Sequence, residues 1–378
     1  MTVTLKDVAK RAGVSIPTVS LIINGRDLPF KESTRRAVLE AVEALNYRPD
    51  SMARRNANGS NRRDAVALLL RSESRSRVSN TPVYEFICGV NDVCMEHNQF
   101  LVMMKLSQLT EPQAGGGPPR VIAERFVDGL IVETGLPPDL ELAVARYRIP
   151  TIWLNSSHHD GVDCIYPDEL HAGQTITEHL VSLGHRHILF VAPLANPHGN
   201  QPHFSAVDRQ RGYERVMAGH RLPIQVIYEE GTPDPQSTSG SMFSDLSGAI
   251  KNILDSRKTE NPITAVIAYD FIQGARILTD LEAQGLLCPR DISIAAANDL
   301  RFLRKMWPEM TGISCDRYQM ARQAAEMMLA KIASGGAAQP SHVWRGSLIP
   351  GSTAAAPPGA SPEKSKRRAA SKKAGAPA

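Results

Sequence analysis

From residue 65 onward, short apolar runs alternate with segments long enough to form helices. The eight runs are AVALLL (65–70), FLVMMKL (100–106), GLIVE (129–133), TIWL (151–154), HILFVA (187–192), QVIYEE (225–230), AVIAYD (265–270) and ISIAAAND (292–299). Continuous apolar strands separated by helix-length segments are typical of parallel sheets covered on both faces. Because the pattern extends over residues 64–353, which is too long for one sheet, we expect an α/β fold with two doubly wound lobes.

Composition supports a folded, multidomain chain. Its 378 residues are 42% hydrophobic, which excludes disordered and fibrous proteins and suggests two or three domains that each bury a core. Ligands of doubly wound sheets bind beyond the carboxyl ends of the strands, so a cleft between the two lobes is the expected binding site.

The N-terminal region has a different periodicity. Apolar residues recur there at spacings of three and four, which predicts three short amphipathic helices around one small core. The three apolar stripes are Val8 and Ala12, then Val19, Ile22 and Ile23, then Val38, Ala41, Val42 and Leu45. The pattern therefore predicts a three-helix domain ahead of the α/β region.

The first two of these helices are joined by a tight turn. Gly13 gives that turn its backbone freedom, and Ser15 is placed to cap the next helix. Because Pro17 has no N–H, the Ser15 oxygen must accept from the amide of Thr18 instead. This arrangement predicts a helix-turn-helix motif.

The second helix of such a motif can lie in the major groove of DNA. The helix would present Ile16, Pro17, Thr18, Leu21 and Asn24 outward. Helix-turn-helix geometry alone is weak evidence, so a three-helix bundle without a DNA role stays an alternative at this point.

A short basic segment follows, with the sequence DSMARRN at residues 50–56. Asp50 is a good N-cap, but the segment is far shorter than the roughly 12 residues that an isolated helix needs in water. We expect it to form a helix only against a partner. In the minor groove Met52 would pry base steps apart, while Arg54 and Arg55 would follow the phosphates.

The charge is unevenly distributed along the chain. Residues 1–63 hold 12 Lys/Arg and 6 Asp/Glu, residues 354–378 hold 6 and 1, and residues 64–353 hold 25 and 32. Basic ends on an acidic body are typical of a protein that binds a polyanion, because Lys and Arg displace counterions condensed on phosphates.

These features together resemble the LacI/GalR family of bacterial repressors over essentially the whole chain. The segments LKDVAKRAGVSIPTVSLIING, TRRAVLEAVEALNYRP and DSMARR resemble the family's headpiece and hinge helix. The resemblance implies that Ile16, Pro17 and Leu21 read bases and that Met52 is the minor-groove wedge.

Two of these positions depart from the family. Relatives commonly carry Arg or another polar residue in place of Leu21, and Leu in place of Met52. Apolar side chains offer a base only contacts such as the one to a thymine methyl group. Operator recognition should therefore depend on Thr18, Ser20, Asn24, DNA shape and the hinge.

The resemblance continues into the core, which is similar to a periplasmic sugar-binding protein. It is carried by HLVSLGHRHILFVA, VDRQRGY and AVIAYDFIQGARILTDLEAQGL. It implies that the effector-contacting residues are Arg209 and Asp270, together with Asn155, Tyr84 and Asn298. Relatives usually carry Asp where this chain has Asn298, so one charge is missing.

The two charged residues suit one kind of ligand. A bidentate Arg209 and an acceptor-only Asp270 would together bind a ligand with adjacent hydroxyls. The alternative is a structural ion pair between these two residues across the lobe. Phe204 and Trp153 are candidates for stacking on a sugar, although a core role is favoured for Trp153.

Other features indicate no further chemistry. His158, His159 and the triplet 185–187 lack metal-ligand spacing and are expected on the surface or in turns. The glycine-rich segment 115–119 is expected to be a flexible loop. We therefore expect no metal, no cofactor and no enzymatic activity, since paired cleft carboxylates are not found.

The expected domains are a headpiece (1–48), a hinge helix and linker (49–63), a two-lobed core (64–353) and a disordered basic tail (354–378). The five cysteines are scattered without a C-x-x-C pair, which favours a reducing compartment. The N-terminus lacks the apolar core of a secretion signal, and no apolar run approaches the roughly 18 residues of a membrane span. We expect a cytoplasmic protein without membrane contact.

The functional hypothesis is a homodimeric, ligand-responsive transcription regulator, most readily a repressor of a carbohydrate catabolic or transport operon. Two-fold symmetry predicts a pseudopalindromic double-stranded operator. The helices at residues 84–97 and 317–332 are candidates for contact with the partner subunit. The effector is expected to be a sugar, with a nucleobase, nucleoside or sugar phosphate as alternatives. An exported solute receptor and an enzyme acting on sugars are the competing classes.

Overall fold

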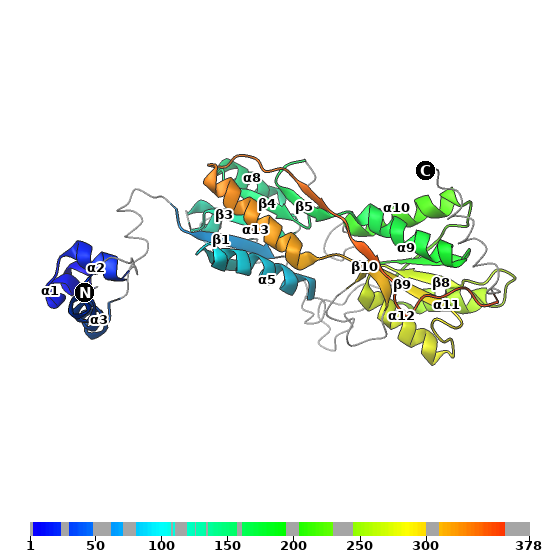
Figure 1. Cartoon of the computed structure of the whole chain (residues 1–378). Helices are drawn as coiled ribbons and strands as arrows, with labels where there is room; N and C mark the ends of the chain where they lie inside the picture. Colours follow the sequence, from blue (N-terminus) through cyan, green and yellow to red (C-terminus); the bar gives the residue numbers. More distant parts are fainter. Residues whose placement is uncertain are drawn as a thin grey trace, which may run out of the picture. The chain divides into compact units, whose positions relative to one another are not determined.

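The computed structural model describes residues 3–23, 30–47, 62–70, 81–106, 109, 119–124, 126–133, 135–156, 161–193, 204–229, 245–299 and 310–359. These divide into two compact units, Met1–Arg63 and Asp64–Ala378 (Figure 1). Several predicted features lie outside the described residues: Asn24, Met52, Arg54, Arg55, the segment 50–56, His158, His159, the segment 115–118 and the tail beyond residue 359.

The first unit is the predicted three-helix domain. Its helices are α1 (Leu5–Ala12), α2 (Ile16–Ile23) and α3 (Glu32–Ala44). All nine residues of the predicted apolar stripes contribute to one core, in which Val8, Val19 and Val38 are fully buried. The helical periodicity of the sequence is therefore confirmed, because each stripe faces the other two.

Hydrogen bonds fix where the first two helices begin and end. Thr4 donates its backbone N–H and its hydroxyl to Asp7 at 2.8 and 2.7 Å, which caps the start of α1. Gly13 adopts the left-handed conformation with φ of 66°, and Val14 N–H donates to the Ala9 carbonyl. The chain consequently turns within three residues into α2.

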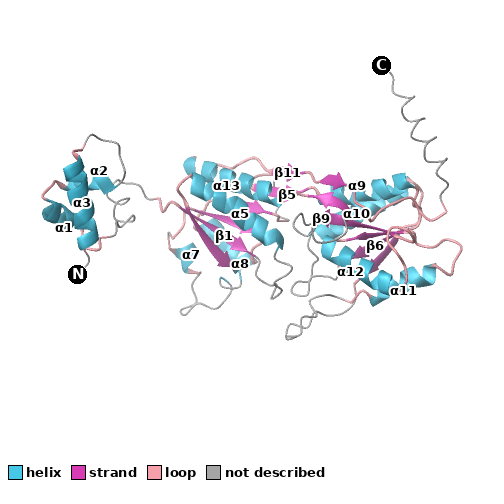
Figure 2. Cartoon of the chain, turned by 60° about the horizontal axis from the view of Figure 1, so that its bottom comes forward, coloured by secondary structure: helices cyan, strands magenta, loops and turns pink. Residues whose placement is uncertain are grey.

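The second unit contains two six-stranded sheets, which define lobe 1 and lobe 2 (Figure 2). Lobe 1 has the strand order β11-β5-β4-β3-β1-β2 and lobe 2 the order β12-β10-β9-β8-β6-β7. All neighbouring strands are parallel except β10 and β12. The strands of lobe 1 are β1 (Ala65–Leu70), β2 (Phe100–Lys105), β3 (Gly129–Glu133), β4 (Thr151–Leu154), β5 (Cys164–Pro167) and β11 (His342–Trp344).

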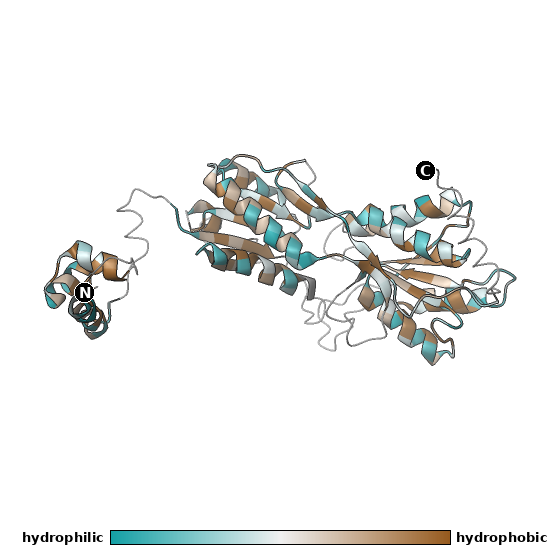
Figure 3. Cartoon of the chain, in the orientation of Figure 1, coloured by the Kyte–Doolittle hydropathy of each residue, from teal (hydrophilic) through white to brown (hydrophobic). Residues whose placement is uncertain are grey.

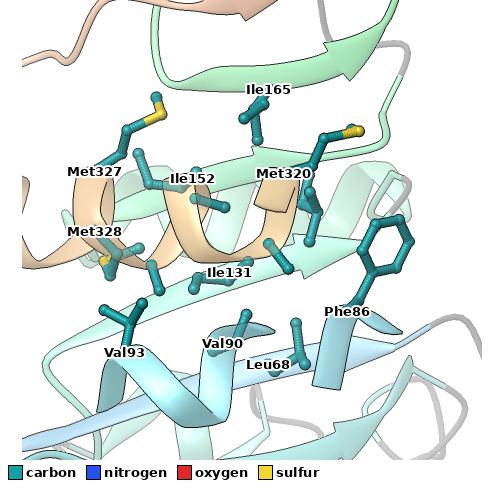
Figure 4. Close-up of a cluster of buried hydrophobic side chains, with 14 of the residues drawn as sticks. Leu68, Phe86, Val90, Val93, Ile131, Ile152, Ile165, Met320, Met327 and Met328 are labelled. Atoms are coloured by element: carbon teal, nitrogen blue, oxygen red, sulfur yellow. The ribbon is translucent and has the colours of Figure 1, made fainter. Parts of the chain in front are cut away.

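Helices cover both faces of the lobe 1 sheet. One face packs against α5 (Thr81–Glu96) and α13 (Arg317–Ala333), and Figure 4 shows the side chains that meet there. The other face packs against α7 (Arg120–Ala123) and α8 (Pro138–Arg146). Because successive strand residues face opposite layers and both layers are covered, the strand sequences are continuously apolar.

Lobe 2 repeats this design. Its strands are β6 (Ile188–Ala192), β7 (Gln225–Tyr228), β8 (Ala265–Ala268), β9 (Ser293–Asp299), β10 (Thr311–Ser314) and β12 (Ser347–Ile349). Helices α9 (Glu169–Leu183) and α10 (Phe204–Gly219) cover one face, while α11 (Ser247–Ser256) and α12 (Phe271–Ala283) cover the other. In Figure 3 the strands of both sheets are mostly coloured as hydrophobic. The predicted pair of doubly wound lobes is confirmed.

The described chain passes between the lobes at three places. Asp168 joins β5 to α9, residues 315–316 join β10 to α13, and residues 345–346 join β11 to β12. Asp168 and Asp316 have nearly the same backbone angles, φ of −76° and −78°, and each caps the helix that follows. The crossings are also linked to one another, since Asp168 N–H donates to the Trp344 carbonyl at 2.9 Å.

Beyond the crossings, the C-terminal segment follows lobe 2. Ala355 N–H donates to the Ser293 hydroxyl at 3.0 Å, and the Ala355 carbonyl oxygen lies 2.8 Å from Nε2 of His185. His185 was predicted to be a surface or turn residue. It does lie in the connection between α9 and β6, but the surface expectation is wrong, because the side chain is fully buried. Its second ring nitrogen lies 2.9 Å from the Thr264 hydroxyl.

Candidate functional site

The first candidate site is the start of α2. The Thr18 amide donates to Ser15 Oγ at 3.3 Å, and the two hydroxyls are 2.8 Å apart, which confirms the predicted cap. Ser15, Ile16 and Pro17 are exposed at this end of the helix. Ile16 leaves 44% of its surface open to solvent.

The remaining described residues of this site are partly covered. Thr18, Ser20 and Leu21 are half-buried on α2, beside the core residues of the unit. Exposed cations lie on the neighbouring α1, at Lys6, Lys10 and Arg11. An exposed apolar helix start with cations on the adjacent helix suits a DNA groove, because apolar contacts reach base edges while cations bind phosphates.

The second candidate site lies in lobe 2 and centres on Arg209. Arg209 projects from α10, and its Nε and Nη2 groups both donate to the Glu169 carboxylate at 2.6 Å. The side chains of this pair are only 3% and 7% exposed. Such a two-bond arrangement is the strongest geometry for an arginine and a carboxylate.

Tyr269 completes the surroundings of the guanidinium. Arg209 Nη1 donates to the Tyr269 carbonyl oxygen at 2.9 Å, and the guanidinium carbon lies 4.5 Å from the centre of the Tyr269 ring. The Tyr269 hydroxyl is hydrogen-bonded to Ser205 at 2.6 Å. Both ends of this tyrosine are therefore fixed against α10 and Arg209.

Arg209 and Asp270 do not form the ion pair that was the alternative to ligand binding. Asp270 follows β8 and caps α12, where its carboxylate accepts the Gln273 N–H at 2.8 Å. Arg209 instead uses Glu169. Sequence reasoning missed Glu169 because an acidic residue in the first turn of a helix is ordinary, and the two partners are 40 residues apart.

Burial and charge shift the pKa values at this site. Burial lowers the pKa of Arg209, but the charges of Glu169, Tyr269 and Asp270 and the hydrogen bonds to Glu169 together offset this and hold that pKa above its ordinary value. Burial raises the pKa of Asp270, against the lowering effect of the Gln273 N–H and of Arg209. Arg209 is thus a permanent cation whose charge Glu169 balances.

Asn298 lies near the end of β9 and is half-buried. Its side-chain oxygen accepts a hydrogen bond from Arg317 Nη2 at 2.6 Å. Arg317 is the first residue of α13, directly after the crossing at Asp316. The bond therefore connects a predicted effector residue of lobe 2 to a helix of lobe 1.

The other predicted residues are spread over both lobes. Asn155 follows β4 in lobe 1 with a φ of 50°, and its N–H donates to the Ile165 carbonyl at 2.8 Å. Tyr84 is exposed on α5, also in lobe 1. Phe204 is half-buried at the start of α10. Trp153 is buried in the lobe 1 core, as favoured from the sequence.

A pocket of about 250 Å³ lies beside this cluster in lobe 2. Its lining comes from the end of β6, the outward side of α10 and the end of β7: Ala192, Pro193, Ala206, Val207, Gln210, Arg211, Glu214 and Tyr228. Arg209 and Asp270 do not line it, so the pocket is a separate feature from the charged cluster.

The described residues offer neither a metal site nor a membrane span. Within those ranges, no three His, Cys, Asp or Glu side chains are grouped so as to hold a metal ion. None of the described helices has the length and apolar character needed to cross a membrane.

Comparison with known proteins gives these sites their context. The family described as "Bacterial regulatory proteins, lacI family" matches residues 4–50, and "Periplasmic binding protein-like domain" matches residues 177–354. The chain belongs to the LacI family. The first match contains α2, and the second contains Arg209, Asp270 and Asn298.

Relatives cover nearly the whole chain. The transcriptional regulator GalR of Salmonella typhimurium is 28% identical over 92% of this chain and 94% of its own length. The transcriptional repressor PurR of Aliivibrio fischeri is 27% identical over 87% and 91%. A lac repressor dimer bound to operator and the anti-inducer ONPF has the same fold, with a TM-score of 0.70 at 19% identity over 94% of this chain and 100% of that one.

These likenesses establish the general activity. The chain is a DNA-binding transcriptional regulator of the LacI family with a ligand-binding type of core. Members of this family bind operator DNA and small-molecule effectors, and the lac repressor is a dimer on its operator. The class of effector is left open by identities below 30%.

Proposed function

We propose that this regulator is a repressor of an operon for the breakdown or uptake of a carbohydrate. It would bind a pseudopalindromic operator as a homodimer, with one α2 in the major groove of each half-site. A small molecule bound between lobe 1 and lobe 2 would change its affinity for that operator.

One observation carries this proposal. The same chain joins an exposed apolar helix start, Ile16 and Pro17, to a core whose buried charged cluster lies at the carboxyl ends of parallel strands. Apolar side chains at an exposed helix start can contact base edges in a DNA groove, and strand ends are where doubly wound sheets bind ligands. A sensor and a DNA reader in one chain are the parts that a ligand-controlled repressor requires.

Asp270 supports a sugar as the effector. An ionised carboxylate only accepts hydrogen bonds, so it selects ligand groups that donate, such as hydroxyls. The half-buried Asp270 is fixed by the Gln273 N–H, and its remaining acceptor positions suit a ligand hydroxyl. Asn298 adds an amide whose oxygen is already engaged by Arg317.

The segment 49–63 would couple the two events. A ligand that changes the angle between the lobes would change the separation of the paired segments across the dimer, and thereby their fit to the minor groove. Coupling of this kind is typically worth about 1 to 3 kcal/mol, or roughly 5- to 150-fold in affinity.

DNA selection tests the reading role of α2. The full chain would be used to select duplexes from a random library. Its affinity for the selected duplexes would then be measured by fluorescence anisotropy with excess random competitor DNA. Ile16→Ala removes an apolar contact of about 1 to 2 kcal/mol, so specific affinity should fall roughly 5- to 30-fold. Binding to the random competitor should change little, since phosphate contacts dominate there.

Leu39→Ala is the matched control. Leu39 is also an exposed aliphatic residue of the first unit, with 52% of its surface open, but it lies on α3. Its removal should leave operator affinity unchanged. Equal losses for both variants, or selection of no sequence at all, would contradict the proposed reading of DNA by α2.

A further inference from the structure

The hydrogen bonds that Arg209 makes within the protein leave few of its N–H groups available to a ligand. An arginine has five N–H donors in a planar fork. Three of them in Arg209 are hydrogen-bonded, two to Glu169 and one to the Tyr269 carbonyl, and the Tyr269 ring lies over the guanidinium. The cation that the sequence assigned to the effector is therefore already paired.

The backbone holds this pair in place. A Cβ atom at Gly173 of α9 would collide with the carbonyl group of Arg209, and one at Gly212 of α10 would collide with the Leu170 carbonyl. The two helices thus approach as closely as glycine allows, with Glu169 and Arg209 at the same crossing. Glu169 is also the first residue of α9, so its carboxylate lies at the positive end of the helix dipole.

The charges around the pair decide which ligands can bind. Glu169 cancels the charge of Arg209, and Asp270 follows β8 directly after Tyr269, so these three residues together carry a net negative charge. A phosphate or carboxylate entering here would lose its hydration and face two carboxylates, while Arg209 is already paired with Glu169 and Arg317 already donates to Asn298. A neutral hydroxyl has no such cost, because it donates to Asp270.

We propose that Glu169 sets the charge specificity of the effector site. By sequestering Arg209 in a neutral pair, it makes the site accept an uncharged, hydroxyl-bearing molecule and reject phosphate esters and carboxylates. This inference rests on the proposed location of the effector site, and it names the ligand class that the site takes. Glu169 acts through Arg209 and is a specificity-determining residue.

The wild-type protein gives the first test. Neutral sugars and their phosphate or acid counterparts, such as glucose with glucose 6-phosphate and gluconate, would be titrated into the full chain in isothermal calorimetry. For any pair of which one member binds, the neutral member should bind at least about tenfold more tightly. Equal or tighter binding of the charged member would overturn the proposal.

The Glu169→Gln variant gives the second test. It keeps the shape of the side chain but removes its charge, so Arg209 becomes an unpaired buried cation. Inorganic phosphate should then raise the melting temperature of the variant in a concentration-dependent manner, which it should not do for the wild type. The double variant Glu169→Gln with Arg209→Gln should lose this response.

Glu178→Gln is the matched control. Glu178 also lies on α9 and loses the same charge, but it is 55% exposed and pairs with His220. It should behave like the wild type toward phosphate, which excludes binding to the basic ends as the cause. If Glu169→Gln does not fold, the wild-type titrations still decide the question.

The outcomes separate this inference from the proposed function. A wild type that binds its operator and responds to a phosphate ester more strongly than to the neutral sugar overturns only the role of Glu169. A phosphate response gained by Glu169→Gln and lost in the double variant, in a chain that selects no DNA, supports the role of Glu169 and contradicts the repressor.

Discussion

Each lobe contains a pair of helices bridged by an arginine and a glutamate, but the two bridges differ in burial. In lobe 2, Arg209 of α10 donates twice to Glu169 of α9, and the side chains are 3% and 7% exposed. In lobe 1, Arg322 of α13 donates twice to Glu96 of α5, and the side chains are 22% and 53% exposed. Both bridges have two hydrogen bonds, but Arg209 donates through Nε and Nη2 at 2.6 Å, while Arg322 donates through Nη1 and Nη2 at 2.9 and 2.8 Å.

The helix pairs are alike in other respects too. Both α9 and α13 begin directly after a crossing between the lobes, at Asp168 and Asp316. Both pairs approach at glycine, since a Cβ at Gly89 of α5 would collide with the Tyr318 carbonyl as one at Gly173 would with Arg209. The two lobes therefore pack their helix pairs in the same way. They differ in that the charged pair is buried only in lobe 2.

The burial of the charged pair in lobe 2 indicates that this pair has a role other than stability. A solvent-exposed ion pair contributes little and needs no further explanation. A buried pair costs desolvation of both charges, and well-packed apolar residues would often be at least as stable. The charged cluster of lobe 2 is accordingly better explained by ligand recognition than by stability.

The largest expected effect comes from removing one arginine at a time. Arg209→Leu leaves Glu169 buried without a partner and should lower the free energy of unfolding by about 3 to 5 kcal/mol. Arg322→Leu leaves an exposed glutamate and should cost less than about 1 kcal/mol. Urea titrations followed by circular dichroism measure both. Similar losses would show that burial does not distinguish the two bridges.

The next effect concerns pH, which should affect the stability of lobe 2 more than that of lobe 1. Burial lowers the pKa of His185 in lobe 2 from 6.5 to about 4. The unfolded chain therefore binds a proton at this residue below pH 6.5, while the folded chain does so only below about pH 4. Stability from this group is complete above pH 6.5 and decreases as the pH falls between these values, by about 3 kcal/mol at about 1.4 kcal/mol per pKa unit.

Hydrogen exchange measured at pH 7 and pH 5 can test this prediction. Amides of lobe 2 around β6, β8 and the segment 353–357 should lose protection at the lower pH before those of lobe 1. His185→Gln should reduce the difference, because glutamine does not titrate. An unchanged pH response in the variant would assign the effect to other groups.

Much of the fold was predictable from the amino-acid sequence. Each of the eight apolar runs contains a strand. All of these strands except β2 and β7, which lie at sheet edges, are buried on both faces and therefore apolar without interruption. The short strands β5, β10, β11 and β12 were not predicted. They have only three or four residues, and β11 pairs with β5, which lies far earlier in the sequence.

The candidate sites were predictable to different degrees. The cap of α2 followed from Ser15 and the missing N–H of Pro17, since both are local. The partners of Arg209 and Asn298 did not, because Glu169 and Arg317 come together with them only through tertiary packing. The burial of His185 likewise depends on the C-terminal segment, 170 residues further along the chain.

The most direct test of the central claim is the effect of a bound ligand on operator affinity. The dissociation constant of the full chain for its selected duplex would be measured by fluorescence anisotropy, with and without a neutral sugar that stabilises the core. A change of roughly 5- to 150-fold is expected, which Asp270→Ala abolishes while operator binding without ligand is retained. An operator affinity that is the same with and without every ligand that binds the core would contradict the claim.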